Sequence, residues 1–254
     1  MMNTKTMKIA AVVASVLALS ACNSDDAKEA LDHAKDQVQG IVDGDTVYFQ
    51  TVNMVMNGDT GAQVSLYDAA VGANMKPLFD GEKNQSSIYQ NSHINIHAGG
   101  DKHTVSLALE DVGTNKTIET KDISVRKDDY KLIIAYGQNE NDKAGLVIQD
   151  APEAVASSDN MRVFVADYSD TELKTPSKVS FNGTSVDLKD GLISAPFTVA
   201  KAEANQRLEV TAASGAALGT CEFSPTDFKV DNVLLVLSAD QQTCYSMPLQ
   251  VAPQ

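Results

Sequence analysis

Residues 130–136 read Tyr-Lys-Leu-Ile-Ile-Ala-Tyr and residues 233–237 read Val-Leu-Leu-Val-Leu, and these two apolar runs decide the fold. Short apolar runs of this kind predict strands. A polar loop and one last predicted strand follow each of them. The two runs therefore occupy the same place in two similar segments of the chain.

The residues before the first run also predict strands. Residues 93–97 alternate strictly between apolar and polar side chains and 103–109 alternate as well, while 47–52 and 64–67 are rich in β-branched and aromatic residues. Asn57-Gly58-Asp59 between the last two has the composition of a turn. Many short strands at this spacing are typical of a β-sandwich or a β-barrel.

The same order of elements returns in the second part of the chain. Residues 162–166 correspond to the opening strand, 178–183 align with 63–68, and 207–211 take the place of 103–107. We predict two diverged copies of one β-domain of about 100 residues each, with coincidence among generic strand patterns as the alternative. The predicted boundaries are 46–150 for the first domain, 151–160 for a linker and 161–254 for the second domain.

The N-terminus has the pattern of a bacterial lipoprotein signal. Lys5 and Lys8 form a positive region, residues 9–19 are apolar or small, and Leu19-Ser20-Ala21-Cys22 resembles a lipobox. The apolar run is shorter than the roughly 20 residues that span a bilayer. We expect a signal peptide over residues 1–21 and acyl chains, palmitate among them, on Cys22. A plain secretory signal or a short membrane anchor is the alternative.

Residues 22–45 differ in texture from the β segments. Small or apolar residues recur four and three positions apart, at Ala27, Leu31, Ala34, Val38 and Ile41. This is helical spacing over only about two heptads, and short isolated helices are marginal in water. We predict a lipidated, partly helical tether, with a self-associating coiled coil as the alternative.

The predicted location is the outer membrane. Residue 23, the second of the mature chain, is Asn rather than the Asp that retains lipoproteins of the enterobacterial type in the inner membrane. Both the periplasmic and the cell-surface face stay open as the side on which the protein lies.

Both β segments resemble the DUF4397 domain of exported bacterial proteins and lipoproteins. Residues 162–169 (RVFVADYS) resemble the opening strand of the family, 179–183 (VSFNG) its hairpin, and 123–137 a later segment with Tyr130 and Gly137 in place. The chain departs from the family after Asn53, where a proline-containing turn is absent. The resemblance implies two tandem immunoglobulin-like β-sandwich domains and no chemistry.

Charge excludes one class of partner. The chain has 20 basic and 34 acidic residues and a formal net charge of −14. Such a chain repels nucleic acid and anionic lipid headgroups, so we expect neither DNA nor RNA as a partner.

Two cysteines remain once Cys22 is acylated. Export favours a structural disulfide between Cys221 and Cys244. A reactive thiol pair is the alternative, and no C-x-x-C spacing supports it.

The sequence holds no catalytic motif among those sought: no G-x-S-x-G, S-x-x-K, P-loop or G-x-G-x-x-G. His93 and His97 would lie roughly 13 Å apart on one strand face, too far to share one zinc ion. A metal site that combines His93, His97 or His103 with a neighbouring strand is an alternative.

The loop at residues 139–142 superficially resembles a calcium loop. An EF-hand needs Gly and Glu where Ala144 and Asp150 stand, so it is excluded, and a looser calcium site is the alternative.

We therefore expect no catalytic residue, no cofactor and no metal. The predicted function is that of a non-catalytic lipoprotein of the cell envelope, held in the membrane by its N-terminal lipid. Its sandwich domains would present loops to an envelope protein or a glycan. The alternative is a structural or assembly subunit that oligomerises through the tether or an edge strand.

Overall fold

The computed structural model describes residues 46–69, 77–83, 87–96, 102–139, 143–155, 159–189, 191–203, 205–239 and 243–253. The expected signal peptide 1–21, Cys22 and the tether 22–45 lie outside these residues, as do His97 and the loop 140–142. None of the described helices is of a length and hydropathy that would cross a membrane.

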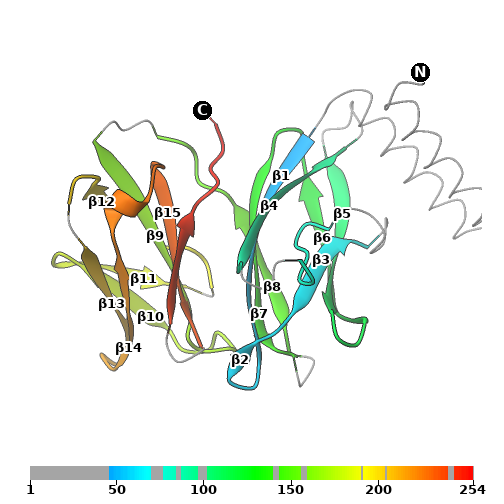
Figure 1. Cartoon of the computed structure of the whole chain (residues 1–254), viewed down its shortest axis with the longest axis horizontal. Coiled ribbons are helices and arrows are strands. Elements are labelled where there is room, and N and C mark those ends of the chain that lie inside the picture. The colour runs from blue at the N-terminus through cyan, green and yellow to red at the C-terminus, as the bar shows by residue number, and fades with distance from the viewer. Residues whose placement is uncertain are drawn as a thin grey trace, which may run out of the picture.

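The described chain is almost entirely β-structure, and its strands form two similar halves (Figure 1). The strands of the first half are β1 (Thr46–Asn57), β2 (Thr60–Gly61), β3 (Val64–Asp68), β4 (Tyr89–Asn95), β5 (His103–Asp111), β6 (Lys116–Val125), β7 (Tyr130–Gln138) and β8 (Gly145–Asp150). The strands of the second half are β9 (Asn160–Tyr168), β10 (Ser177–Phe181), β11 (Thr184–Leu188), β12 (Phe197–Ala200), β13 (Gln206–Ala212), β14 (Ala217–Phe223), β15 (Asn232–Ser238) and β16 (Cys244–Pro248).

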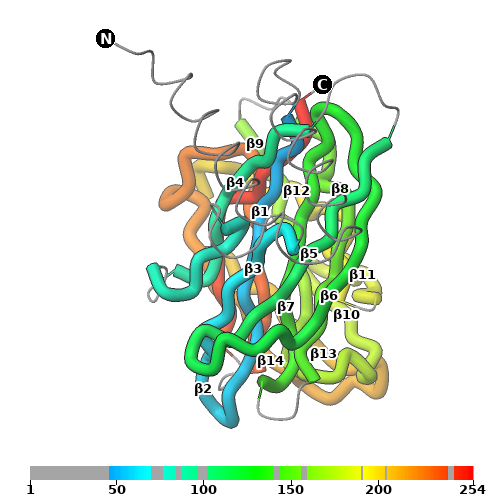
Figure 2. Tube along the Cα trace, turned by 90° about the vertical axis from the view of Figure 1, so that its right-hand side faces the viewer, coloured from blue at the N-terminus to red at the C-terminus, as the bar shows by residue number. Residues whose placement is uncertain are grey.

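In the first half, two sheets face each other. The inner sheet has the order β4-β1-β7-β8, with β2 added at the end of β1, and the outer sheet has the order β3-β5-β6. β1 pairs antiparallel with β4 and parallel with β7. Figure 2 shows this half from its outer side, with β5 and β6 toward the viewer.

The second half repeats this plan. Its inner sheet has the order β12-β9-β15-β16, again with a parallel central pair, β9 and β15. Its outer sheet has the order β11-β10-β13-β14. β10 and β11 form a hairpin whose turn residues, Asn182 and Gly183, both have positive φ (48° and 79°), as the common Asn-Gly turn requires.

Each half has its own core between its two sheets. The first core contains Phe49, Leu107 and Ile133, and the second contains Val163, Leu208 and Leu235. Each of these six side chains is fully buried. The all-β fold of two tandem β-sandwiches predicted from the sequence is confirmed.

A third core lies between the halves, where the two inner sheets pack face to face (Figure 1). It contains Val52 and Ile134 from the first half and Phe164, Leu234 and Met247 from the second. The inner strands are therefore buried on both faces. This explains why residues 130–136 and 233–237 are nearly continuous apolar runs.

Hydrogen bonds reinforce the third core at two places. The Gln50 amide donates to the carbonyl oxygen of Pro248 (2.7 Å), and Gln50 Oε1 accepts from the backbone N–H of Gln250 (2.9 Å). On the opposite edge, Gln149 Oε1 accepts from the backbone N–H of Ile193 (3.3 Å). The contact is thus reciprocal, because each half presents the same inner sheet to the other.

The segment between the halves is held by the end of the chain. Ala154 N–H donates to the Ala252 carbonyl (2.7 Å) and Ala252 N–H to the Pro152 carbonyl (3.0 Å). The C-terminus accordingly lies between the halves in Figure 1.

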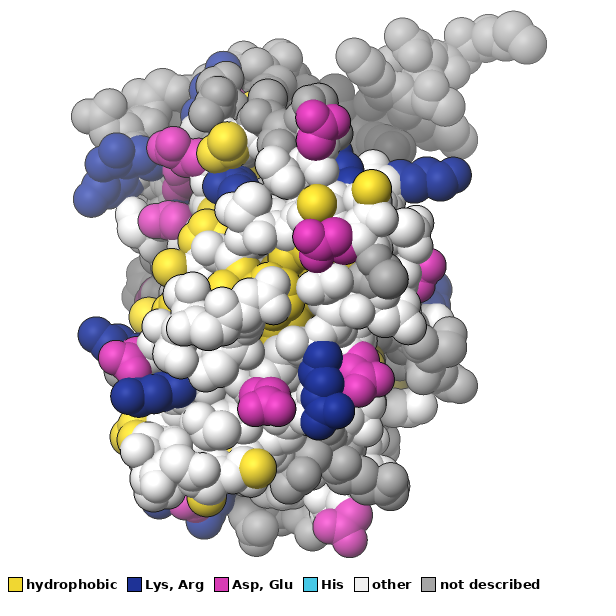
Figure 3. Space-filling view, turned by 90° about the vertical axis from the view of Figure 1, so that its left-hand side faces the viewer, with side chains coloured by type: hydrophobic (Ala, Val, Ile, Leu, Met, Phe, Trp, Pro, Cys, Tyr) yellow, Lys and Arg dark blue, Asp and Glu magenta, His cyan; other side chains and the backbone are white. Residues whose placement is uncertain are grey.

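The outer sheet of the second half faces away from the first. Acidic and basic side chains are interspersed on the face shown in Figure 3, and apolar side chains show mainly near its centre. Cross-strand ion pairs on this sheet join Lys178 to Asp187 (3.6 Å) and Arg207 to Glu222 (3.9 Å). All four side chains are largely exposed, so these pairs contribute little to stability.

Candidate functional site

The inner sheets of the two halves match residue by residue. Tyr48 N–H donates to the Asp129 carbonyl in the first half, and Arg162 N–H donates to the Asp231 carbonyl in the second, both at 2.8 Å. Tyr48 therefore corresponds to Arg162.

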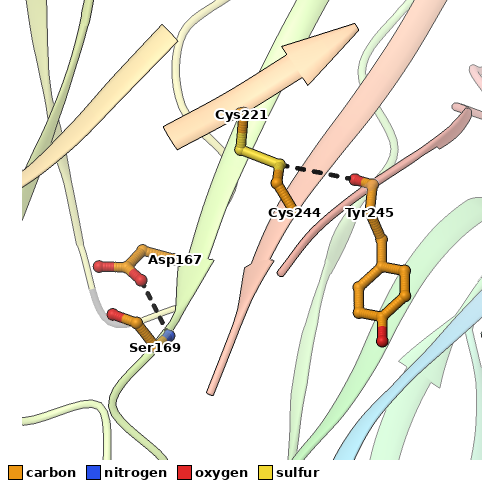
Figure 4. The surroundings of a disulfide bond; sticks show 5 residues. All are labelled: Asp167, Ser169, Cys221, Cys244 and Tyr245. Atoms are coloured by element: carbon orange, nitrogen blue, oxygen red, sulfur yellow. Dashed lines mark hydrogen bonds between the residues drawn. A yellow bond between two sulfur atoms is a disulfide. The ribbon is translucent and has the colours of Figure 1, made fainter. Parts of the chain in front are cut away.

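The same match holds at the other end of these strands. Asn53 Oδ1 accepts from Val55 N–H (3.0 Å), and Asp167 Oδ1 accepts from Ser169 N–H (2.9 Å), as Figure 4 shows for Asp167.

The next position differs between the halves. Met54 on β1 lies beside Tyr136 on β7, whereas in the second half Tyr168 on β9 lies beside Ser238 on β15. The tyrosine thus stands on the C-terminal strand of the central pair, β7, in the first half and on the N-terminal strand, β9, in the second. Because the halves face each other reciprocally, both tyrosines meet at one place and Met54 and Ser238 meet at the corresponding place.

The two tyrosines fill their side of the junction. The ring centres of Tyr136 and Tyr168 are 5.8 Å apart, and Tyr168 Oη donates to the Gly191 carbonyl (2.7 Å). A Cβ on Gly191 would come within 2.8 Å of Tyr168 Oη and 2.9 Å of a Leu173 methyl carbon. Next to them lies a hollow of about 20 Å³, whose described lining includes Asp167, Gly191 and Leu192 of the second half.

The Met54 and Ser238 side is open. A pocket of about 380 Å³ lies there, with walls from both halves, and we call it the junction pocket. Its lining residues are Asn53, Met54, Val55, Met56, Gly61, Ala62, Gln63, Phe79, Gly81, Ser87, Ile88, Ser238 and Tyr245. None of these side chains is a carboxylate, an ammonium, a guanidinium or an imidazole.

Hydrogen bonds fix the polar wall of the junction pocket. Asn53 Nδ2 donates to the Ala62 carbonyl (2.8 Å), and Ser87 Oγ donates to the Tyr89 carbonyl (2.9 Å). Gly81 allows the backbone to approach closely, since a Cβ there would lie 2.2 Å from the Val64 carbonyl oxygen. Backbone and side-chain contacts among the described residues therefore hold the pocket in shape.

A disulfide lies next to Tyr245 in the sequence and in the fold. Cys221 on β14 and Cys244 on β16 are bonded, with their Cα atoms 5.1 Å apart, and Cys221 is fully buried. Cys244 Sγ also lies 3.9 Å from the Tyr245 carbonyl oxygen, a contact and not a hydrogen bond because oxidised sulfur carries no proton. Figure 4 shows the Tyr245 ring pointing away from the disulfide toward the strands of the first half.

Lys131 and Asp170 have shifted pKa values and lie outside the junction pocket. Burial alone would lower the pKa of Lys131, but hydrogen bonds to Asp150 (2.5 Å) and Asp129 (3.2 Å) outweigh it and raise that pKa. Burial likewise opposes the lowered pKa of Asp170, whose carboxylate accepts from the backbone N–H groups of Glu172, Lys174 and Thr175. These interactions hold strand ends and a turn in place, so they are structural.

The residues singled out from the sequence do not assemble into a metal or catalytic site in the described part of the chain. His93 lies exposed on β4 and His103 lies at the start of β5. Among the described residues, no three His, Cys, Asp or Glu side chains lie close enough to hold a metal ion. Asp128 and Asp129 form a turn, in which Asp128 has φ 58° and Asp129 Oδ2 accepts from Arg126 N–H (2.9 Å).

Sequence reasoning did not identify the junction pocket. Its walls come from β1, from the segments around β2 and before β4, and from the β15–β16 hairpin. No sequence motif joins these segments. That the tyrosine stands on β7 in one half and on β9 in the other becomes visible only once the strand register is known.

Comparison with known proteins shows distant likeness to solved structures alone. No protein-family model and no curated protein matches the chain. Among solved structures, it is similar to a family 26 carbohydrate-binding module of Amy13K from Eubacterium rectale, crystallised with maltoheptaose. That likeness has 9% identity and a TM-score of 0.25, over 80% of this chain and 97% of the module. A TM-score this low supports no inference about function.

Proposed function

We propose that this chain is a non-catalytic protein of the bacterial envelope, anchored in the outer membrane by lipid on Cys22, and that it binds its partner in the junction pocket. The observation that carries the binding role is the pocket itself: about 380 Å³, held in shape by hydrogen bonds, and lined by described residues of both halves. Small-molecule sites are typically concave and preformed, and they often lie between domains.

The chemistry of the lining favours binding over catalysis. General acid–base catalysis uses a side chain whose pKa is tuned near the working pH, and nucleophilic catalysis uses a nucleophile beside a base. The described lining offers amides, two serine hydroxyls, thioethers and one phenol. Lys131, Asp170 and Tyr168, whose pKa values are shifted, all lie outside this lining.

Membrane attachment rests on the lipobox at residues 19–22. A single acyl chain binds membranes only marginally, and several chains together make release negligible. We therefore expect the protein to stay with the outer membrane during fractionation, and the Cys22→Ala variant to leave that fraction. Equal membrane retention of the variant and the wild type would contradict the lipid anchor.

The binding role is tested in living cells by photo-crosslinking from the rim of the junction pocket. Gln63 is exposed at this rim and is replaced by benzoylphenylalanine, which reacts with nearby C–H bonds of proteins and glycans alike. The matched control carries the same group at Ser185, which is exposed on the outer sheet of the second half.

We expect an adduct from position 63, none from position 185, and loss of the adduct when Ser238→Tyr fills the junction pocket. Equal adducts at both positions, or an adduct that survives Ser238→Tyr, would overturn the pocket as the site of binding.

The edge strands do not favour the alternative of an assembly subunit. β6 is the longest edge strand described, and it carries Lys116, Glu119, Lys121 and Asp122. Charged side chains on an edge oppose the addition of a further strand. The Lys121 ammonium also donates to the Leu146 carbonyl on β8 (2.9 Å), which ties this edge back to the same molecule.

A further inference from the structure

We infer that the junction pocket takes one uncharged sugar ring. This inference rests on the proposed function, because it names the ligand class of the same pocket. Three properties of the pocket carry it: the absence of charged side chains among its described lining residues, the hydrogen-bonding capacity of its polar residues, and its size.

Charge excludes ionic ligands. A charged group that enters a pocket must give up hydration, and this is costly unless an opposite charge meets it there. The described lining has no cationic side chain for an anion and no carboxylate for a cation. The net charge of −14 repels anions further. A neutral ligand meets neither obstacle.

The polar wall fits hydroxyl groups, which both donate and accept hydrogen bonds. The Gln63 amide makes no hydrogen bond to a described residue, so it offers two N–H groups and a carbonyl oxygen. Asn53 uses one N–H and one lone pair internally and keeps one further N–H and lone pair. Ser87 Oγ spends its proton on the Tyr89 carbonyl and keeps its lone pairs as acceptors.

The pocket is also lined by apolar groups. Tyr245 comes from the second half and Ile88 and Met54 from the first, so an aromatic ring and aliphatic groups line the pocket together with the polar side chains. A sugar ring has hydroxyls around its edge and C–H groups on its faces, which matches this division. An entirely apolar ligand would leave the polar wall without partners, at a cost for each desolvated group.

The size of the junction pocket fits one ring better than a chain. About 380 Å³ lies near the lower end of the range for ligand sites, roughly 300–1,000 Å³. Tyr136 and Tyr168 block the equivalent place on the other side of the junction. We therefore expect one sugar unit per described molecule at the junction.

The experiment is saturation-transfer NMR on the full-length chain in detergent, with glucose, galactose, mannose and N-acetylglucosamine as neutral probes. Glucuronic acid tests charge, since it differs from glucose by one carboxylate. N-acetyl-leucine amide stands for a protein side chain as the occupant. The variants are Ser238→Tyr, which fills the pocket, and Gln63→Ala, which removes an exposed amide. Ser246→Tyr, at an exposed position of β16, is the matched control.

We expect at least one neutral sugar to bind the wild type and Ser246→Tyr equally, and to bind Ser238→Tyr and Gln63→Ala at least about tenfold more weakly. Glucuronic acid should bind roughly tenfold more weakly than glucose or not at all. Binding that survives both pocket variants would overturn the inference, and so would preferential binding of glucuronic acid.

Failure of this inference is distinguishable from failure of the proposed function. Binding of N-acetyl-leucine amide alone, abolished by Ser238→Tyr, would overturn the sugar and leave a protein partner in the same pocket. If no probe binds and photo-crosslinking from position 63 is also insensitive to Ser238→Tyr, both fall together.

Discussion

At the scale of single residues, one exchange of side chains separates the two sides of the junction. Met54 and Ser238 stand where Tyr168 and Tyr136 stand on the closed side. The tyrosines are structural: Tyr168 is 2% exposed, and burial, with Tyr136 beside it, raises its pKa well above the usual range. Its hydroxyl donates a hydrogen bond to the Gly191 carbonyl (2.7 Å).

The Tyr168→Phe variant tests this role. The change leaves the buried Gly191 carbonyl without its donor, and we expect the free energy of unfolding to fall by about 1–2 kcal/mol in urea titration. Tyr48→Phe is the control, because Tyr48 stacks on Tyr130 (ring centres 4.5 Å apart) and its hydroxyl bonds to no described residue. An equal loss in both variants would contradict the assignment.

Asp170 holds the turn after β9, and its contribution depends on pH. Its pKa is lowered below the usual 3.8, because hydrogen bonds to the carboxylate outweigh the effect of burial. A lowered folded pKa stabilises the protein above the unfolded pKa, and this stability is lost as the pH falls through the folded pKa. We expect Asp170→Asn to cost about 1–3 kcal/mol at neutral pH, since its amide nitrogen cannot accept these bonds.

The difference between wild type and Asp170→Asn should shrink as the pH falls below about 4, because the wild-type carboxyl then also becomes neutral. Unfolding by urea at a series of pH values measures it. Asp59→Asn, in the exposed turn between β1 and β2, should show almost no difference at any pH. A difference for Asp170→Asn that is constant down to about pH 2 would contradict the argument.

At the scale of elements, local sequence patterns predict where most strands lie but not which strands pair with each other. The alternating residues 103–109 and the apolar residues 130–136 form β5 and β7, because period and apolarity are local signals. Residues 116–122 of β6 give no such signal, since β6 is an edge strand with most side chains exposed. The junction pocket depends on register between distant strands, so no local pattern contains it.

The disulfide fixes β16, the strand that carries Tyr245. Cys221 and Cys244 are 23 residues apart, and closing a loop of this length stabilises by about 3 kcal/mol on the chain-entropy estimate. We expect the double variant Cys221→Ala/Cys244→Ala to lose about that much in urea titration. Reductant should lower the free energy of unfolding of the wild type by the same amount and leave that of the double variant unchanged.

Intact mass supplies the control. The wild type should be two protons lighter than its reduced form. A wild type with two free thiols, or a double variant as stable as the wild type, would show that the bond contributes nothing.

At the scale of the whole molecule, the third core makes one body of the two sandwiches. Val52, Leu132, Ile134, Leu234 and Val236 are fully buried between the inner sheets. Neither half could be removed without exposing this apolar face to water. We therefore expect the halves to unfold in one cooperative transition.

The Leu234→Ala variant tests this cooperativity. Removing a buried leucine side chain costs about 2–5 kcal/mol. Because Leu234 serves both halves, hydrogen-exchange mass spectrometry should show β5 and β13 losing protection together. Leu208→Ala, in the core of the second half alone, provides a comparison of similar severity. Loss of protection in β13 with β5 unchanged would show two independent units.

Binding of a neutral sugar in the junction pocket is measured most directly by NMR of the methionine methyl groups. Met54 and Met56 line the junction pocket, while Met161 is buried in the core of the second half. The full-length chain, labelled with ¹³C at its methionine methyl groups, is titrated in turn with the four neutral sugars. We expect at least one sugar to shift the Met54 and Met56 signals and to leave the Met161 signal unchanged. Four titrations that move neither Met54 nor Met56, or that move Met161 equally, would contradict it.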